Sequence, residues 1–235
     1  MSHQLPLFPL RTVLFPSAQL SLHIFEERYR LMVGRCLHES SPFGIVLIRS
    51  GSEVSPDDPW TQRLRAAAGI PEDQMPRSDT VPHAVGTSAR ISDSVRLEDG
   101  RYYLVVVGQR RFRIQHITQR QPYLVAAVSY LPESLSESAA AAAAELRALY
   151  DRYWELLSIA TGQRYEPEAL PEDPLELTYA LAQRLNVDND RKQRWLEADA
   201  ETRISELLAL LRAELALLPG SGPRDVGFGR PWSWN

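Results

Sequence analysis

Histidines and paired carboxylates are the side chains of this sequence that could bind a metal ion or transfer protons. The five histidines are widely separated, and none stands in an H-x-x-x-H arrangement, so the spacing predicts no metal site. Glu26–Glu27 and Asp57–Asp58 are adjacent pairs, which do not face each other as an acid and a base across a substrate. We therefore expect neither a metal nor another cofactor.

Cys36 is the one cysteine of the chain and could form a nucleophilic pair with a histidine. It lies at helical spacing from Tyr29, Met32 and Val33, on the apolar face of a helix expected at about residues 26–38. Core packing therefore explains Cys36 better than catalysis does. A single cysteine cannot form an internal disulfide, which fits a reducing compartment.

Nucleotide hydrolysis and proteolysis of the serine–lysine type each need a lysine in a defined setting. The phosphate-binding pattern G-x-x-x-x-G-K-[ST] does not occur in the chain. A serine–lysine dyad needs a buried lysine with a lowered pKa. The only lysine, Lys192, lies in the charged stretch DNDRKQRW and is expected on a solvated helix face. We therefore assign no catalytic residue and expect the chain not to be an enzyme.

The run QRRFRI at residues 109–114 is the strongest nucleic-acid signal, because arginines alternate with an aromatic residue. In a β-strand, Arg111 and Arg113 would project from one face and Arg110 and Phe112 from the other, which divides the patch. The net charge of −4 and the single lysine also fit nucleic-acid binding poorly. We expect no nucleic-acid partner, and RNA binding stays an alternative.

The elements that position these residues begin with a strand-rich half at residues 1–132. Apolar runs bounded by glycine and proline predict short strands around the helix at 26–38, which is typical of a small barrel or sandwich. Residues 50–82 are polar and contain several prolines, so we expect an insertion that is either a mobile excursion or a functional loop. The strands are expected near residues 19–24, 43–48, 102–107, 111–117 and 123–130.

From residue 133 the apolar spacing becomes helical. Ser134 and Glu137 form a capping-box pattern before a helix expected at 135–160. Three further helices are expected after caps at Asp173, Asp188 and Asp199.

This second half is expected to be a helical bundle at 133–218 with its own core, followed by a glycine- and proline-rich tail at 219–235. The charge changes at the same boundary: residues 1–132 carry 15 basic and 12 acidic side chains, and residues 133–235 carry 11 and 18. No stretch approaches the roughly 18 consecutive apolar residues of a membrane span, and the first residues lack a signal-peptide pattern. We therefore expect a cytoplasmic protein without membrane contact.

Several ordered blocks of the sequence resemble the amino-terminal, substrate-binding domain of Lon proteases. The opening block at 6–33, PLFPLRTVLFPSAQLSLHIFEERYRLMV, is similar to the family's P-L-F-P-L-x-x-V-L-F-P and L-x-L-x-I-F-E-x-R-Y patterns. The resemblance covers nearly the whole chain except the insertion and the tail. The later blocks are FGIVLIRSG (43–51), VGTSARI (85–91), DGRYYLVVVGQRRFRI (99–114), PYLVAAV (122–128) and the stretch 172–211.

The resemblance implies an α+β fold, with a PUA-like β-barrel (a pseudobarrel) followed by a C-terminal helical bundle. It also implies a non-catalytic module that recognises polypeptides, because the ATPase and protease modules of Lon do not occur in this chain. The expected partners are unfolded or exposed apolar polypeptide segments, with a protease or a chaperone as a further partner. Binding is expected in an apolar groove edged by arginines.

An enzyme of unrecognised type on the same scaffold is the other alternative, and a deep polar pocket with a titratable pair would favour it. Adaptor, regulator and decoy are the three roles open to such a recognition module. The candidate polypeptide-binding residues are Phe8, Arg11, Phe15, Trp60, Trp232 and Trp234.

Overall fold

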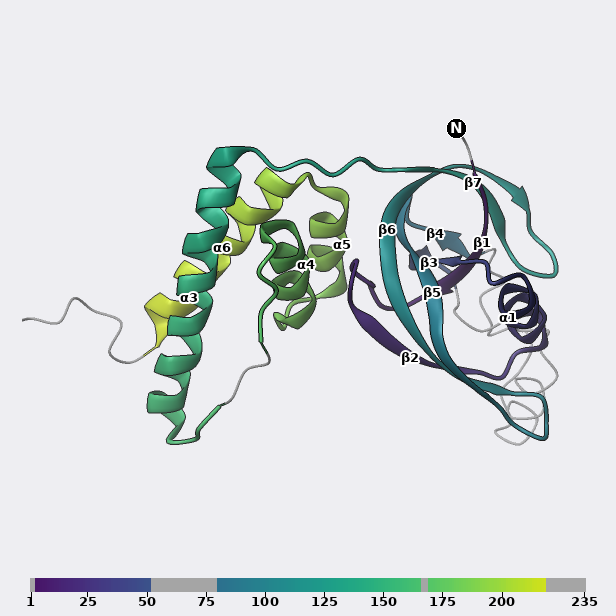
Figure 1. The fold of residues 1–235 in the computed structure, drawn as a ribbon, viewed down its shortest axis with the longest axis horizontal. Coiled ribbons are helices and arrows are strands. Elements are labelled where there is room, and N and C mark those ends of the chain that lie inside the picture. Colours follow the sequence, from purple (N-terminus) through teal and green to yellow (C-terminus); the bar gives the residue numbers. More distant parts are fainter. Residues whose placement is uncertain (1–2, 52–79, 166–168, 219–235) are drawn as a thin grey trace, which may run out of the picture.

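The computed structural model describes residues 3–51, 80–165 and 169–218. This part of the chain forms two halves, shown side by side in Figure 1. One half holds the strands and a single helix, and the other holds four helices. An extended segment joins the halves. Most of the predicted insertion and the whole predicted tail lie outside the described residues.

Seven strands form the described sheet. Their order is β1–β7–β6–β5–β3–β4, and β2 pairs with β6. β1 also pairs with β3, in parallel, so the path of strands returns to β1. The α+β class is therefore confirmed, whereas the PUA-like pseudobarrel stays a prediction. The strands are β1 (His3–Leu10), β2 (Gln19–Ile24), β3 (Phe43–Ser50), β4 (Val81–Pro82), β5 (Val85–Arg96), β6 (Tyr102–Gln119) and β7 (Val125–Tyr130).

β6 is one strand of 18 residues where the sequence predicted two, and Gly108 lies inside it. The Gly108 N–H donates to the Ala18 carbonyl at 2.9 Å, and the Ser17 N–H donates to the Gly108 carbonyl at 2.9 Å. A β-carbon at position 108 would lie 2.2 Å from the carbonyl oxygen of Phe15. Gly108 therefore permits a close approach between β6 and the loop before β2, and the prediction that it ends a strand was wrong.

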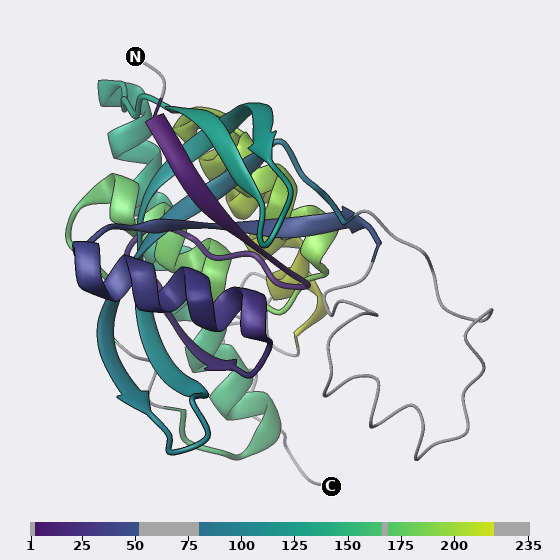
Figure 2. The same ribbon diagram turned by 90° about the vertical axis from the view of Figure 1, so that its right-hand side faces the viewer.

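Helix α1 (Glu27–Glu39) lies across the sheet half, in front of the strands in Figure 2. Tyr29, Met32, Val33 and Cys36 are all buried, so the predicted apolar face is confirmed. They pack in one cluster with strand residues such as Phe43. Burial raises the pKa of the Cys36 thiol, which disfavours the reactive thiolate.

The second half contains α3 (Glu137–Thr161), α4 (Pro174–Arg184), α5 (Asn189–Glu197) and α6 (Ala200–Leu217). None of the helices in the described ranges is long and apolar enough to cross a bilayer. The predicted caps Asp173, Asp188 and Asp199 are confirmed, because each carboxylate accepts the backbone N–H three residues further on.

The start of α3 differs from the prediction. Ser136, not Ser134, is the N-cap, and its hydroxyl accepts the Ala139 N–H at 3.3 Å. The extended segment after β7 continues to Ser136, so the predicted capping box at Ser134 and Glu137 was wrong. The long helix itself is confirmed.

The largest apolar cluster contains residues of both halves. Val13, Phe15, Leu47 and Val85 of the strand half pack in it with residues of all four C-terminal helices. Most members of this cluster belong to the helices, so the helical half has extensive apolar contacts of its own, and a bundle with a separate core stays a prediction. The apolar surfaces of these helices are completed by the sheet half, so the interface between the halves is part of the main core.

Candidate functional site

A groove at one edge of the sheet is the candidate functional site, and we call it the β4 groove. It lies beside the short strand β4, between the end of β3 and the hairpin of β6 and β7, and its volume is about 240 Å³. It is lined by Arg49, Thr80, Val81, Pro82, His83, Ala84, Ile114, Ile117, Arg120 and Leu124.

The floor of the β4 groove is apolar. Ile114, Ile117 and Leu124 are half-buried and pack against the sheet cluster that contains Phe112. The Ile114 N–H donates to the Ala84 carbonyl at 2.8 Å, which ties β6 to the segment that follows β4. Sites for small molecules usually have about 300–1,000 Å³. The smaller β4 groove suits one large apolar side chain better than a cofactor.

The rim of the β4 groove is basic. Arg49 and Arg120 are exposed, and His83 is half-buried with its Nδ1 3.6 Å from a carboxylate oxygen of Glu197 on α5. None of the lining residues is acidic. An apolar floor edged by arginines is the arrangement that the polypeptide-binding hypothesis requires.

Two of the predicted contact residues, Phe8 and Phe15, lie in the core. The Phe8 ring packs edge-on against Tyr29, with 4.3 Å between ring centres. Phe15 is fully buried, and its ring centre lies 6.1 Å from that of Tyr179 on α4. Both rings stabilise the fold by burial and are not accessible to a polypeptide in this structure.

Arg11, the third predicted contact in the described residues, is exposed but does not line the β4 groove. Its Nη2 donates to the Gly51 carbonyl at 3.0 Å, and its own carbonyl accepts Nδ2 of Asn189 at 2.7 Å. The remaining predicted contacts, Trp60, Trp232 and Trp234, lie outside the described residues. Of the predicted set, the three residues that the structure describes do not meet at one surface, since Phe8 and Phe15 are buried in different clusters and Arg11 is exposed.

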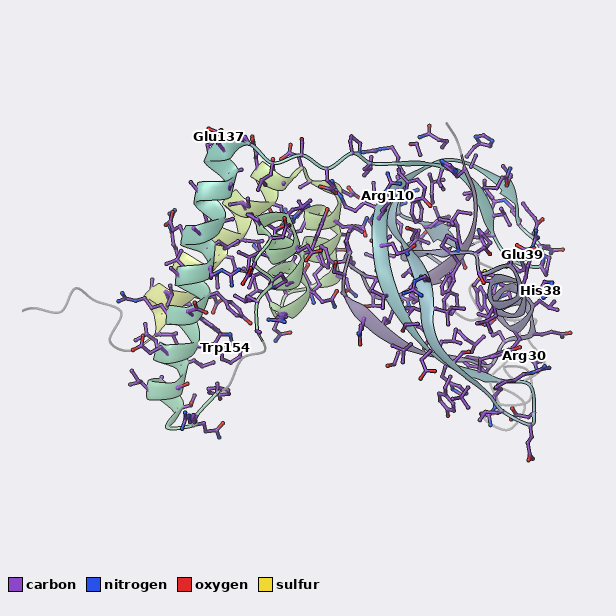
Figure 3. The ribbon with its side chains drawn as sticks, in the orientation of Figure 1. Arg30, His38, Glu39, Arg110, Glu137 and Trp154 are labelled. Atoms are coloured by element: carbon purple, nitrogen blue, oxygen red, sulfur yellow. The ribbon has the colours of Figure 1, made fainter. Side chains whose placement is uncertain are left out.

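A second cavity, of about 490 Å³, lies between α1, β1 and the hairpin of β6 and β7. Its charged pair is Arg35 and Glu39, with 2.8 Å between Nε and Oε1, but the two side chains are 63% and 45% exposed. Glu39 is the last residue of α1, which lies on the side of the sheet half away from the helical half (Figure 3). Solvent screens such a pair, and the Cys36 thiol that also lines the cavity has a raised pKa. The cavity thus lacks the activated group that the enzyme alternative requires.

The described residues provide neither a metal-binding cluster nor a serine partner for Lys192 in its recorded contact. They contain no group of three or more His, Cys, Asp or Glu side chains that could hold a metal ion. Lys192 is half-buried, not solvated as predicted, and its Nζ donates to the Gln183 carbonyl at 2.8 Å. Burial lowers the pKa of Lys192. Because this acceptor is a backbone carbonyl and not a serine hydroxyl, the contact is structural.

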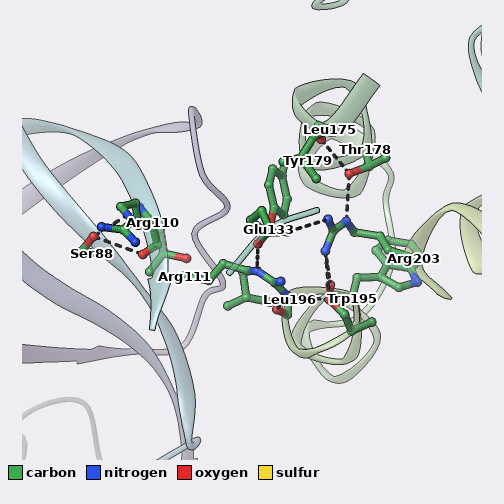
Figure 4. Close-up of polar contacts among 12 residues, drawn as sticks. Ser88, Arg110, Arg111, Glu133, Leu175, Thr178, Tyr179, Trp195, Leu196 and Arg203 are labelled. Atoms are coloured by element: carbon green, nitrogen blue, oxygen red, sulfur yellow. Dashed lines mark hydrogen bonds and ion pairs between the residues drawn. The ribbon is translucent and has the colours of Figure 1, made fainter. Parts of the chain in front are cut away.

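We call the interface between the two halves the seam. The arginine run at 109–114 is divided there, because Arg111 points into the seam and Arg110 does not (Figure 4). Arg111 is 4% exposed; its Nε donates to Glu133, and its Nη1 donates to the Leu196 and Ala198 carbonyls, both at 2.6 Å. Arg110 is exposed and lies over the Tyr130 ring, 4.4 Å from its centre. Arg111 is therefore enclosed between the halves while Arg110 stays at the surface, and the run presents no continuous basic surface.

Glu133 contacts two further side chains at the seam. The Tyr179 hydroxyl donates to Glu133, and Nη2 of Arg203 lies 3.9 Å from its other carboxylate oxygen. Arg203 Nε donates to the Thr178 hydroxyl at 2.9 Å. Burial raises the pKa of Tyr179 and lowers that of Arg203. We call Arg111, Glu133, Tyr179 and Arg203 the seam network.

The seam network also holds the end of α5 beside the β4 groove. Arg111 binds the carbonyl of Leu196, and the next residue, Glu197, faces His83 of the β4 groove. Gln193, one turn earlier on α5, donates its Nε2 to the Val85 carbonyl at 3.0 Å. The helical half is therefore held against the strands next to the site.

A family model, the ATP-dependent protease La (LON) substrate-binding domain, matches residues 4–213. Among curated relatives, the Lon protease of Brevibacillus choshinensis is 24% identical over 222 residues, which are 92% of this chain and 25% of that protein. Lon protease 2 of Syntrophobacter fumaroxidans is 27% identical over 203 residues, 84% of this chain and 22% of that protein. The chain spans about a quarter of the length of these relatives.

Two solved structures share the fold. The Lon N-terminal domain protein from Xanthomonas campestris is 28% identical with a TM-score of 0.58, and the match covers 88% of this chain and 98% of that one. The N-terminal domain of the Mycobacterium avium complex Lon protease has a TM-score of 0.59 at 18% identity, covering 89% and 98%. The resemblance found in the sequence blocks is thereby confirmed.

Proposed function

This chain belongs to the family of ATP-dependent protease La (LON) substrate-binding domains, and from this membership we propose that it binds exposed apolar segments of unfolded polypeptides in the β4 groove. The observation that carries the proposal is the groove's half-buried floor of Ile114, Ile117 and Leu124. Apolar side chains at a concave, preformed surface gain free energy by covering a further apolar side chain.

The size of the groove sets the affinity that we expect. Burying one leucine or phenylalanine side chain contributes about 1.5–3 kcal/mol, and ordering a flexible segment offsets part of this gain. Even a micromolar complex needs about 8 kcal/mol in total. Binding should therefore be micromolar or weaker, with little preference among large apolar side chains.

We propose that the chain acts without catalysis, as a recognition or adaptor module that presents its clients to a protease or a chaperone. Two contacts in the described residues support this role. The Cys36 thiol is held in the core with a raised pKa, and Lys192 donates to a backbone carbonyl. The raised pKa disfavours the Cys36 thiolate, and the Lys192 amine, although burial lowers its pKa, donates to a carbonyl and not to a serine hydroxyl.

The test is a fluorescence-anisotropy titration of a labelled ten-residue peptide with one central leucine among glycine and serine. Ile117→Ala removes floor area, so we expect about a threefold to tenfold weaker complex. Ile159→Ala, at a side chain 68% exposed on α3, is the matched control and should leave the affinity unchanged. Thermal unfolding of both variants verifies that they fold. Equal affinities of Ile117→Ala and the unmodified chain would place the binding elsewhere.

A further inference from the structure

Three segments that build the β4 groove contain no acidic residue. They are residues 40–51 with β3, residues 80–92 with β4 and the start of β5, and residues 108–132 with the hairpin of β6 and β7. The chain as a whole has a net charge of −4. The acidic side chains of the chain therefore belong to other segments, one of which brings Glu197 to His83. The arginines of the three segments are Arg49, Arg90, Arg110, Arg111, Arg113 and Arg120.

Arg49 and Arg120 are the two of these arginines that line the β4 groove, and both are exposed. Within the described ranges, neither forms an ion pair, whereas Arg111 is paired with Glu133. The carboxylate beside the groove is Glu197, which faces His83 and also accepts Nε2 of Gln193 at 2.8 Å. The guanidinium groups at the rim are therefore available to an anion beside the apolar floor.

We propose that the β4 groove selects apolar segments that carry an aspartate or glutamate next to the apolar anchor, an inference that rests on the proposed function. The anchor covers Ile114, Ile117 and Leu124, and the neighbouring carboxylate pairs with Arg49 or Arg120. Guanidinium groups bind carboxylates through two parallel hydrogen bonds, which adds direction to a contact that is otherwise apolar.

The lining residues favour a peptide over a nucleic acid. They include no phenylalanine, tyrosine or tryptophan, and the one ring among them on which an unpaired base could stack is the half-buried imidazole of His83. An apolar floor would also leave the polar edges of a base without hydrogen-bond partners. A carboxylate beside an apolar side chain matches both the rim and the floor.

The expected size of the effect follows from the exposure of the arginines. Exposed ion pairs contribute little, so each arginine should account for about a twofold to fivefold change in affinity. Salt screens such pairs, with a Debye length of about 10 Å at 0.1 M. The preference for acidic segments should therefore vanish at about 0.5 M salt, while the apolar contribution remains.

The experiment uses three acetylated and amidated peptides with a central leucine. They differ only at the position beside it, which holds aspartate, asparagine or lysine. Each is titrated against the full chain and against Arg49→Gln and Arg120→Gln. Arg152→Gln, at an exposed position on α3, is the control with the same loss of charge. We expect the aspartate peptide to bind at least about threefold more tightly than the asparagine peptide, and both groove variants to reduce this ratio.

Each other outcome contradicts a distinct part of the proposal. Equal binding of the aspartate and asparagine peptides would refute the acidic preference and leave the proposed function standing. Absence of binding by all three peptides would refute the proposed function itself. A uridine oligonucleotide is the remaining probe. If it bound the full chain more tightly than the peptides do, and if Arg49→Gln weakened its binding, the rim would serve a nucleic acid.

Discussion

Arg203 lies over the ring of Tyr179, with 4.1 Å between the guanidinium carbon and the ring centre. Arg203 is 0% exposed and Tyr179 is 3% exposed. Tyr179 also donates its hydroxyl to Glu133, whose carboxylate pairs with Arg111. Because Arg203, Tyr179 and Arg111 belong to α6, α4 and β6, this cluster fixes the helices on the sheet beside the β4 groove.

Replacing Arg111 by methionine should lower the free energy of unfolding by about 3 kcal/mol, because it leaves the partners of a buried ion pair uncompensated. Urea unfolding followed by circular dichroism measures the change. Arg113→Met is the control, since Arg113 is exposed on the same strand and should cost less than about 0.5 kcal/mol. Equal costs for the two variants would show that the seam network contributes no stability.

The shared core predicts that the helical half does not fold by itself. A fragment of residues 133–218 would expose the apolar surface that Val13, Phe15, Leu47 and Val85 cover in the full chain. We expect the fragment to unfold without a cooperative transition, whereas the full chain unfolds in one. Differential scanning calorimetry separates these cases, and a sharp heat-absorption peak from the fragment alone would contradict the expectation.

Gly108→Ala should destabilise the chain by about 3 kcal/mol, because the added methyl group collides with the Phe15 carbonyl and overpacks the loop before β2. Gly162→Ala is a useful comparison, since position 162 has a positive φ of 68° but no atom within 4 Å of the added carbon. It should cost only about 1 kcal/mol, from backbone strain. If thermal unfolding gave the two variants the same melting temperature, close approach would not be the role of Gly108.

The burial of Tyr179 leads us to expect a loss of folding stability at alkaline pH. Burial raises the pKa of its hydroxyl above the ordinary value of 10, so the folded state keeps a proton that the unfolded state releases. The corresponding stability is complete below pH 10 and is lost as the pH rises toward the folded pKa. Tyr179→Phe should lower the free energy of unfolding by about 1 kcal/mol at pH 8. Between pH 8 and pH 11 the free energy of unfolding of this variant should fall less than that of the unmodified chain. Urea unfolding at the two pH values measures both changes. An equal fall in the free energy of unfolding for the variant and the unmodified chain would contradict this assignment.

Local signals in the sequence were sufficient for most features of the helices, with the start of α3 as the exception. The apolar face of α1 and the caps at Asp173, Asp188 and Asp199 depend on residues within one or two turns, so spacing alone predicted them. The roles of Gly108 and Phe15 depend instead on a contact between segments about ninety residues apart. Spacing along the chain carries no information about such a contact.

The β4 groove was missed for the same reason. Arg49 and Ile117 come together only because β3 pairs with β5 and β5 with β6, and this register was not predicted. One signal in the sequence could have indicated the groove, namely the absence of aspartate and glutamate from residues 108–132 in an acidic chain. Phe8 and Phe15 were proposed as contacts because exposed and buried aromatic residues look alike in a sequence.

Methyl NMR of the full chain with 13C-labelled isoleucine tests the central claim most directly, because it reports on the groove floor during binding. Titration with an apolar peptide should shift the methyl signals of Ile114 and Ile117 and leave that of Ile204, buried on α6, unchanged. Shifts at Ile159 or Ile91, with none at Ile114 and Ile117 when the peptide is saturating, would contradict the assignment of the β4 groove.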